Sequence, residues 1–178
     1  MTSRSPGEGR YAKVEREQRW FLNAVPRGAN DAREITDHYV TGTSLRLRKI
    51  ASEGEVIYKL AQKIRPDVEN PALLKITNIY LSSDDYDRLL VLDGSTISKR
   101  RHRLVHEGRS FAIDEFKGRH TGLLLAEVEI GEADPRMPTP SFAASEVTSD
   151  NRYSGGWLAG ATDGQLRDLL AITQNTPD

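Results

Sequence analysis

Cysteine is absent from this chain of 178 residues, and so are long apolar runs. Without cysteine there are no disulfides, no thiolate nucleophile and no thiolate-bound zinc, so metal ligands have to be oxygen atoms or imidazole nitrogens. The first ten residues are polar and carry no apolar core, which argues against a signal peptide or a membrane segment there. We therefore expect a cytoplasmic protein with no membrane partner.

Net charge is also nearly absent, because 25 Lys and Arg side chains face 26 Asp and Glu side chains. This balance argues against a protein that binds nucleic acid through bulk positive charge, and we expect no nucleic-acid partner. The sequence contains no P-loop, no dinucleotide-binding glycine motif and no nucleophile elbow. Any phosphate group therefore has to be recognised by side chains.

What the sequence does contain is charge at every second residue in four short stretches. These are Glu15, Glu17 and Arg19; Arg46 and Arg48; Lys99, Arg101 and Arg103; and Glu127 and Glu129. Alternate residues of a β-strand share a face, so each stretch places its charges on one side of a sheet. The residues between them include Leu45, Leu47, Ala126, Val128 and Ile130, which are apolar enough to pack under helices. This pattern is typical of a barrel with a polar interior; the alternative is an unrelated β-domain whose charged face meets solvent.

Most of the chain has the pattern of β-strands. The expected strands are 13–21, 35–40, 44–50, 55–64, 73–81, 97–106, 110–116 and 123–130. A helix is expected to begin at Ser82 or Ser83 and to end at Asp93-Gly94, and a second helical segment covers 156–172, broken near Asp163-Gly164. Eight antiparallel strands with a few packing helices predict a mainly β (α+β) fold built on a closed eight-stranded β-barrel.

We expect one domain, residues 11–173, between a flexible leader (1–10) and a flexible tail (174–178), with a loop at 65–71. The sequence leaves the oligomeric state open between a monomer and a homodimer.

The first strand, with the sequence V-E-R-E-Q-R-W-F-L, resembles the opening E-x-E-x-K strand of the CYTH domain. This family includes class IV adenylate cyclases and thiamine triphosphatases, and its members are also called triphosphate tunnel metalloenzymes. Further motifs that resemble the family's follow in the same order: Tyr39 with 45–48, 59–63, Lys99-x-Arg101, 113–118, 122–129 and 146–153. The resemblance implies an eight-stranded antiparallel barrel whose tunnel, open at both ends, binds a triphosphate and a divalent metal.

The resemblance also implies roles for the charged residues. The basic residues expected to bind phosphate are Arg19, Arg46, Arg48, Lys59, Lys63, Lys99, Arg101 and Arg103. The residues expected to bind metal are Glu15, Glu17, Glu127 and Glu129, whose oxygen atoms suit Mg²⁺ or Mn²⁺; Asp114 is expected either to join them or to anchor a Lys. The expected catalytic residues are Arg19, Glu127, Glu129 and Tyr39, the last as a group that contacts phosphate or orders a water.

Two features depart from the family pattern. Arg19 stands where the family usually has Lys, and because a guanidinium stays protonated we expect a phosphate clamp there and not a general base. Residues 75–80 contain no carboxylate where related members add some, so we expect one metal ion.

The expected function is a metal-dependent phosphohydrolase acting on inorganic triphosphate or another small molecule that contains a triphosphate. Two alternatives stay open. One is a class IV-type adenylate cyclase, which converts ATP to cyclic AMP and pyrophosphate, and the other is a polyphosphate-binding module without catalysis.

Overall fold

The structure is a computed structural model that describes residues 10–65, 72–131 and 134–174. Its strands are β1 (Lys13–Phe21), β2 (Asn30–Val40), β3 (Leu45–Ser52), β4 (Glu55–Ile64), β5 (Leu73–Leu81), β6 (Gly94–His106), β7 (Arg109–Phe116), β8 (Leu124–Ile130) and β9 (Ser145–Glu146). Its helices are α1 (Ser83–Leu89), α2 (Gly155–Gly160) and α3 (Asp163–Gln174), with short 3₁₀ turns η1 (Gly118–His120) and η2 (Asn151–Tyr153). None of the helices in these ranges is long and apolar enough to cross a membrane.

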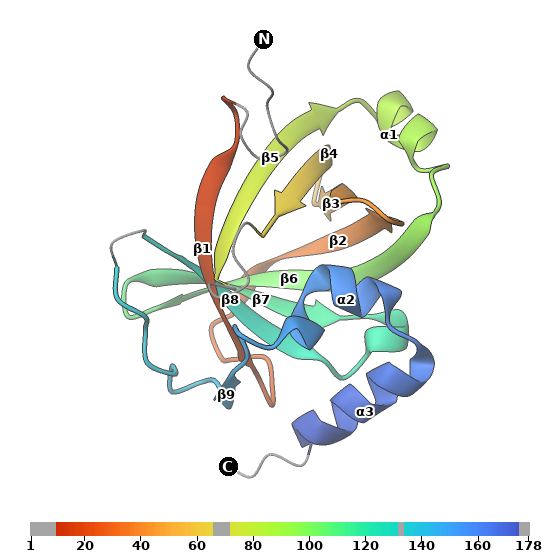
Figure 1. Cartoon of the computed structure of the whole chain (residues 1–178). Coiled ribbons are helices and arrows are strands. Elements are labelled where there is room, and N and C mark those ends of the chain that lie inside the picture. The colour runs from red at the N-terminus through yellow and green to blue at the C-terminus, as the bar shows by residue number, and fades with distance from the viewer. Residues whose placement is uncertain (1–9, 66–71, 132–133, 175–178) are drawn as a thin grey trace.

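The predicted eight-stranded antiparallel barrel is confirmed (Figure 1). The sheet order is β5-β4-β3-β2-β6-β7-β8-β1-β9, and β5 also pairs with β1, which closes the first eight strands into a ring. β1 makes this closure possible because its first half pairs with β5 while most of its length pairs with β8. The ninth strand, β9, adds two residues beside the end of β1.

Several element boundaries differ from those predicted. β2 begins at Asn30, five residues earlier than expected, because a register shift between Asn30 and Arg33 and a positive φ at Asp31 interrupt the alternation there. β6 begins at Gly94 and not at Ile97, since Gly94, Ser95 and Thr96 pair with β2 although these residue types give a weak strand signal. β9 was not predicted; two residues are too short to show a period.

The helices begin close to where the sequence predicts, but α1 ends at Leu89, four residues before the expected end at Asp93-Gly94. Ser82 caps α1, as one of the two expected caps, by accepting a hydrogen bond from the backbone N–H of Asp85. The C-terminal segment forms two helices, and the break lies at 161–162, just before the expected one. α3 includes Gln174, while the rest of the expected tail, the leader except Arg10, and the loop except Arg65 lie outside the described residues.

The barrel has a polar inside and an apolar outside. On one outer side Trp20, Ile113, Ala126 and Val128 form a buried cluster. Met137 and Phe142 cover it, so the prediction that a helix covers this face is wrong: an irregular segment does so.

The residues of α2 and α3, the two blue helices beside β6–β8 in Figure 1, pack against Phe21, Ile97, Phe116 and Leu125. These four side chains lie on the same strand faces as the charged residues, so the two helices cover part of the inner face of the barrel. Burial of the outer cluster around Trp20 fixes the register, because a shift of one residue would turn the charged side chains outward. The alternative of a charged exterior is thereby excluded for β1, β3 and β8.

Candidate active site

A cavity of about 490 Å³ lies inside the barrel, and all eight barrel strands contribute to its wall. Eight basic side chains line it: Arg19, Arg46, Arg48, Lys59, Lys63, Arg65, Lys99 and Arg101. Five acidic side chains line it as well: Glu15, Glu17, Asp37, Glu127 and Glu129. The wall therefore carries an excess of positive charge, although the whole chain carries a formal charge of −1.

The structure brings twelve of the fourteen predicted site residues to this one cavity. The two others are Asp114 and Arg103. Asp114 does not line the cavity but lies buried behind Lys99 and Arg101 and binds both. Arg103 continues the same face of β6 beyond the cavity, where it is exposed and its Nε donates a hydrogen bond to Ser110 Oγ at 3.1 Å.

The strand register places opposite charges directly across from each other. Arg19 is the β-sheet partner of Glu127, and Arg48 is the partner of Asp37. Arg19 Nε donates to Glu127 Oε1 at 2.8 Å, and Arg48 donates to both oxygens of Asp37, at 2.6 and 2.7 Å. Side chains on facing residues are close enough for such pairs without any distortion of the backbone.

A third pair of this kind lies on β6 and β7, between the other two in the sheet order. Arg101 is the partner of Asp114 and donates to both of its oxygens at 2.6 Å, while Lys99 Nζ donates to Asp114 Oδ2 at 2.5 Å. Arg101 also reaches Glu127 Oε2 at 2.9 Å. The result is a continuous chain of ion pairs from Lys99 through Asp114, Arg101 and Glu127 to Arg19.

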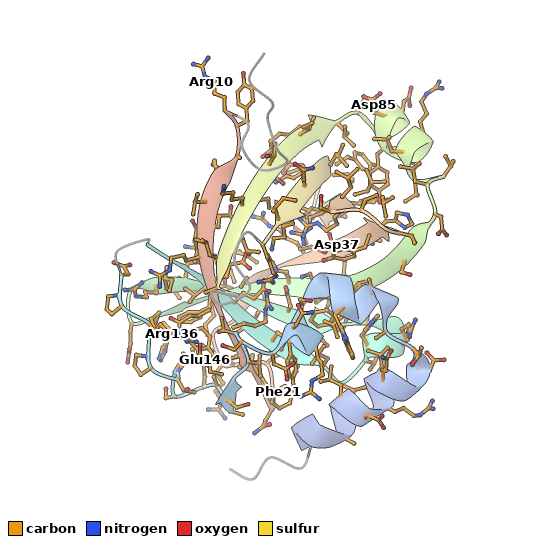
Figure 2. All side chains as sticks on the ribbon, viewed as in Figure 1. Arg10, Phe21, Asp37, Asp85, Arg136 and Glu146 are labelled. Carbon is orange, nitrogen blue, oxygen red and sulfur yellow. The ribbon has the colours of Figure 1, made fainter. Side chains whose placement is uncertain are left out.

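Asp37 and Asp114 are the two carboxylates that neutralise the basic wall from behind, and the side chains of both are almost inaccessible to solvent. Burial alone would raise the pKa of each, but the adjacent guanidiniums outweigh it. Arg48 and Arg46 lower the pKa of Asp37, and Arg101 and Lys99 lower that of Asp114. Both carboxylates are therefore ionised, and Figure 2 shows Asp37 among the side chains enclosed by the barrel.

Asp37 and Arg65 line the cavity but were not among the predicted site residues. The signal for Asp37 was its two-residue spacing from Tyr39, which places both side chains on the inner face of β2. Arg65 lies one residue beyond the end of β4, on the same face as Lys59 and Lys63. The sequence predicts a loop from residue 65, so the two-residue period of a strand could not be used to predict the direction of this side chain.

One nitrogen atom of the Arg46 side chain is buried without a hydrogen bond among the described residues. The side chain is 8% exposed, and this nitrogen, Nε, lies 3.5 Å from Asp37 Oδ1. A buried donor without a partner is costly, so an acceptor atom brought in by a ligand would be bound favourably there.

Three carboxylates form an acidic rim on part of the wall: Glu15, Glu17 and Glu129. Glu17 and Glu129 are direct partners on β1 and β8, and Glu15 lies two residues further along the same face of β1. Burial raises the pKa of Glu15, and the charges of Glu17 and Glu129 raise it further, although Lys63 lowers it. A cation placed at this rim would relieve that repulsion.

Within the described part of the chain, no three His, Cys, Asp or Glu side chains are gathered into a preformed metal site. Mg²⁺ commonly binds to proteins through one or two carboxylates, with phosphate oxygens and waters completing its shell, so it does not require a preformed cage. The donor set of the rim consists of carboxylate oxygens only, which fits a hard divalent cation.

Tyr39 links the cavity to helix α2. Burial and the charge of Asp37 raise the pKa of its hydroxyl, which keeps that group neutral and able to donate. The hydroxyl packs against Gly155, where a Cβ atom would collide with it. Ser154, Gly155 and Gly156 also line the cavity, so the start of α2 forms part of its wall.

No protein-family model matches the chain. A stretch of 57 residues is 37% identical to an inorganic triphosphatase of Acetivibrio thermocellus, and this match spans 32% of the chain and only 36% of that relative. The crystal structure of the inorganic triphosphatase NE1496 aligns with 83% of this chain and 95% of its own, at 24% identity and a TM-score of 0.57.

A second crystal structure of NE1496, described as a hypothetical protein, aligns at 25% identity and a TM-score of 0.58, over 83% of this chain and 98% of its own. The resemblance to the CYTH family is confirmed. The barrel also aligns with PH1819 from Pyrococcus horikoshii OT3 at 15% identity and a TM-score of 0.50, over 91% of this chain and 89% of that one. At 24% and 15% identity, the likenesses to the inorganic triphosphatase structure and to PH1819 concern the fold alone.

Proposed function

We propose that this protein is a divalent-metal-dependent triphosphatase, which hydrolyses inorganic triphosphate or another small molecule carrying a triphosphate. The observation that carries the proposal is the cavity inside the barrel, where eight basic side chains converge and a buried nitrogen of Arg46 lacks a partner among the described residues. A triphosphate is compact, strongly anionic and rich in acceptor oxygens, which is what such a wall binds best. The likeness to the inorganic triphosphatase of Acetivibrio thermocellus supports this substrate class.

The basic residues differ in how firmly they are held, and we assign them different roles in binding. Arg48, Lys99 and Arg101 are fixed by Asp37 and Asp114 and would form a rigid wall that orients the phosphates. Arg46 and Lys63 are less tightly held, since their distances to the nearest carboxylates are 3.5 Å, and they would turn toward the ligand. Arg19 would bind phosphate as a cation, because its pKa is raised by Glu127 and Glu17 although burial opposes this.

The acidic rim of Glu15, Glu17 and Glu129, with Glu127 beside it, would hold Mg²⁺ or Mn²⁺ together with phosphate oxygens. A bound divalent cation supplies charge neutralisation at the phosphates and at the leaving group. The chain's own residues provide positioning: the fixed arginines orient the phosphoryl group, and Tyr39 donates a hydrogen bond to a phosphate oxygen or to a water.

Phosphate release from tripolyphosphate, measured with Mg²⁺ or Mn²⁺ and again with excess chelator, tests the proposal. We expect turnover that the chelator abolishes. Arg46→Met should lower kcat/KM about 10- to 150-fold, which corresponds to a charge-assisted hydrogen bond of roughly 1.5–3 kcal/mol. Arg103→Met is the matched control, because this arginine lies on the same strand face as Arg101 but outside the cavity.

Three outcomes would contradict the proposal. If cyclic AMP forms from ATP while tripolyphosphate stays intact, the protein is an adenylate cyclase and not a triphosphatase. If tripolyphosphate binds tightly in calorimetry without any product, the protein is a binding module. If Arg46→Met and Arg103→Met behave alike, the cavity is not where the substrate binds.

A further inference from the structure

The carboxylates of the cavity are not equally available to a cation. Among the described residues, Glu15 and Glu129 form no ion pair with a basic side chain, and Glu17 is held only at 3.5 Å by Arg19 and Lys63. Glu127 differs, because each of its oxygens accepts a short hydrogen bond, one from Arg19 at 2.8 Å and one from Arg101 at 2.9 Å. Two guanidiniums are therefore in direct contact with this carboxylate.

A divalent cation cannot share Glu127 with both arginines at low cost. A metal ion bound to either oxygen would lie within a few ångströms of a guanidinium, and like charges at that distance repel strongly in a partly buried site. Glu127 becomes a good metal ligand only if one of the two arginines moves away.

The contacts of the two arginines indicate which one moves. Arg101 is anchored by two hydrogen bonds of 2.6 Å to the buried Asp114, so it stays in place. The guanidinium of Arg19 is held by the single short bond to Glu127 and by a 3.5 Å contact with Glu17. Among the described residues it has no second short anchor of the kind that Asp114 gives Arg101.

We propose that Arg19, by binding Glu127, keeps this carboxylate from binding a metal ion when no triphosphate is present. An anionic triphosphate would attract the Arg19 guanidinium to the phosphate oxygens and so free Glu127 as a metal ligand. The proposal rests on the triphosphate site proposed above. Under this proposal, bound triphosphate increases the affinity for the metal, because it draws the Arg19 charge away from Glu127. By reciprocity, bound metal increases the affinity for triphosphate. Arg19, which cannot act as a base, then has a defined role in coupling the two ligands.

Titration with Mn²⁺ alone tests this coupling, with the free ion followed by its paramagnetic resonance signal and the heat by calorimetry. In Arg19→Met we expect the Kd for Mn²⁺ to fall at least about tenfold below that of the wild type, because a nearby positive charge is removed and Glu127 is freed. The double variant Arg19→Met/Glu127→Gln should lose most of that gain.

Arg46→Met is the matched control, since it removes one positive charge from the same cavity but leaves the bonds to Glu127 intact. It should change the Kd for Mn²⁺ much less. If Arg46→Met tightens Mn²⁺ binding as much as Arg19→Met does, or if Arg19→Met does not tighten it, the proposal is overturned. Arg19→Gln, whose amide can still donate to Glu127, serves as a second variant if Arg19→Met does not fold, and an unchanged Kd there would count against the proposal.

No triphosphate is present in this experiment, so its result does not depend on whether the protein is a hydrolase. Failure of the proposed function would appear in the phosphate-release assay, and failure of the coupling would appear in the Mn²⁺ titration.

Discussion

Replacement of Asp37 by Asn tests how much the buried carboxylate contributes to the stability of the barrel. Asp37 is almost completely buried, accepts two hydrogen bonds from Arg48 and lies 3.5 Å from Arg46. Asp37→Asn keeps the shape but leaves two buried guanidiniums without their common counter-charge. Breaking a buried ion pair by removing one partner destabilises a protein by roughly 3–5 kcal/mol.

For a chain of this size, each kcal/mol lowers the melting temperature by roughly 2–4 °C, so Asp37→Asn should melt about 6–20 °C below the wild type. Differential scanning fluorimetry in buffer without phosphate measures this shift. Added tripolyphosphate should raise the melting temperature of the variant more than that of the wild type, because its oxygens replace the lost carboxylate beside Arg46 and Arg48.

Glu34→Gln provides the control on the same strand, since Glu34 pairs with Arg100 on the exposed surface. It should leave the melting temperature close to that of the wild type, because exposed ion pairs contribute little. If Asp37→Asn melts as Glu34→Gln does, the buried pair is not a structural element of the barrel. If tripolyphosphate stabilises both proteins equally, its oxygens do not replace the lost carboxylate beside Arg46 and Arg48.

Two further predictions concern the helix beside the cavity and the acid limit of the fold. Gly155→Ala should destabilise the protein by roughly 1–3 kcal/mol and raise the KM for tripolyphosphate, because its Cβ collides with the Tyr39 hydroxyl; Gly156→Ala, whose Cβ meets nothing within 4 Å, should be neutral or slightly stabilising. An equal loss in both variants, measured by urea unfolding, would reject the Tyr39 contact. Because the pKa of Asp114 is lowered by folding, its stabilisation is complete above the unfolded value of about 3.9 and is lost as the pH falls below it. The free energy of unfolding should therefore decline steeply below about pH 4 in the wild type and less steeply in Asp114→Asn, and parallel declines would contradict the assignment.

The sequence predicted the architecture well because a barrel strand has a local signature. Parts of β1, β3 and β8 carry a charge at every second residue, at 15–19, 46–48 and 127–129, and this period can be read without knowing any partner strand. The same reading found twelve of the residues that line the cavity. It did not find Asp37, although the spacing to Tyr39 was visible, because a single acidic residue in a strand is most often solvent-exposed.

The sequence could not reveal which charges meet. Asp114 had been expected to bind metal or to anchor a Lys, and the register of β6 and β7 sets it opposite Arg101 and close to Lys99, with both oxygens occupied. Its contacts are those of a counter-ion to the two basic side chains. Arg103 likewise shares the face of Arg101, and only the length of the cavity shows that it lies beyond the wall.

What the sequence determined by itself is the alternation of charged and apolar residues, the eight barrel strands and the likeness to the CYTH family. What only the tertiary structure decided is the set of partners: Arg48 with Asp37, Arg101 with Asp114, and Arg19 with Glu127. The physical reason is that the direction of a side chain depends on a period of two along one strand, whereas its partner depends on the register between strands far apart in the chain.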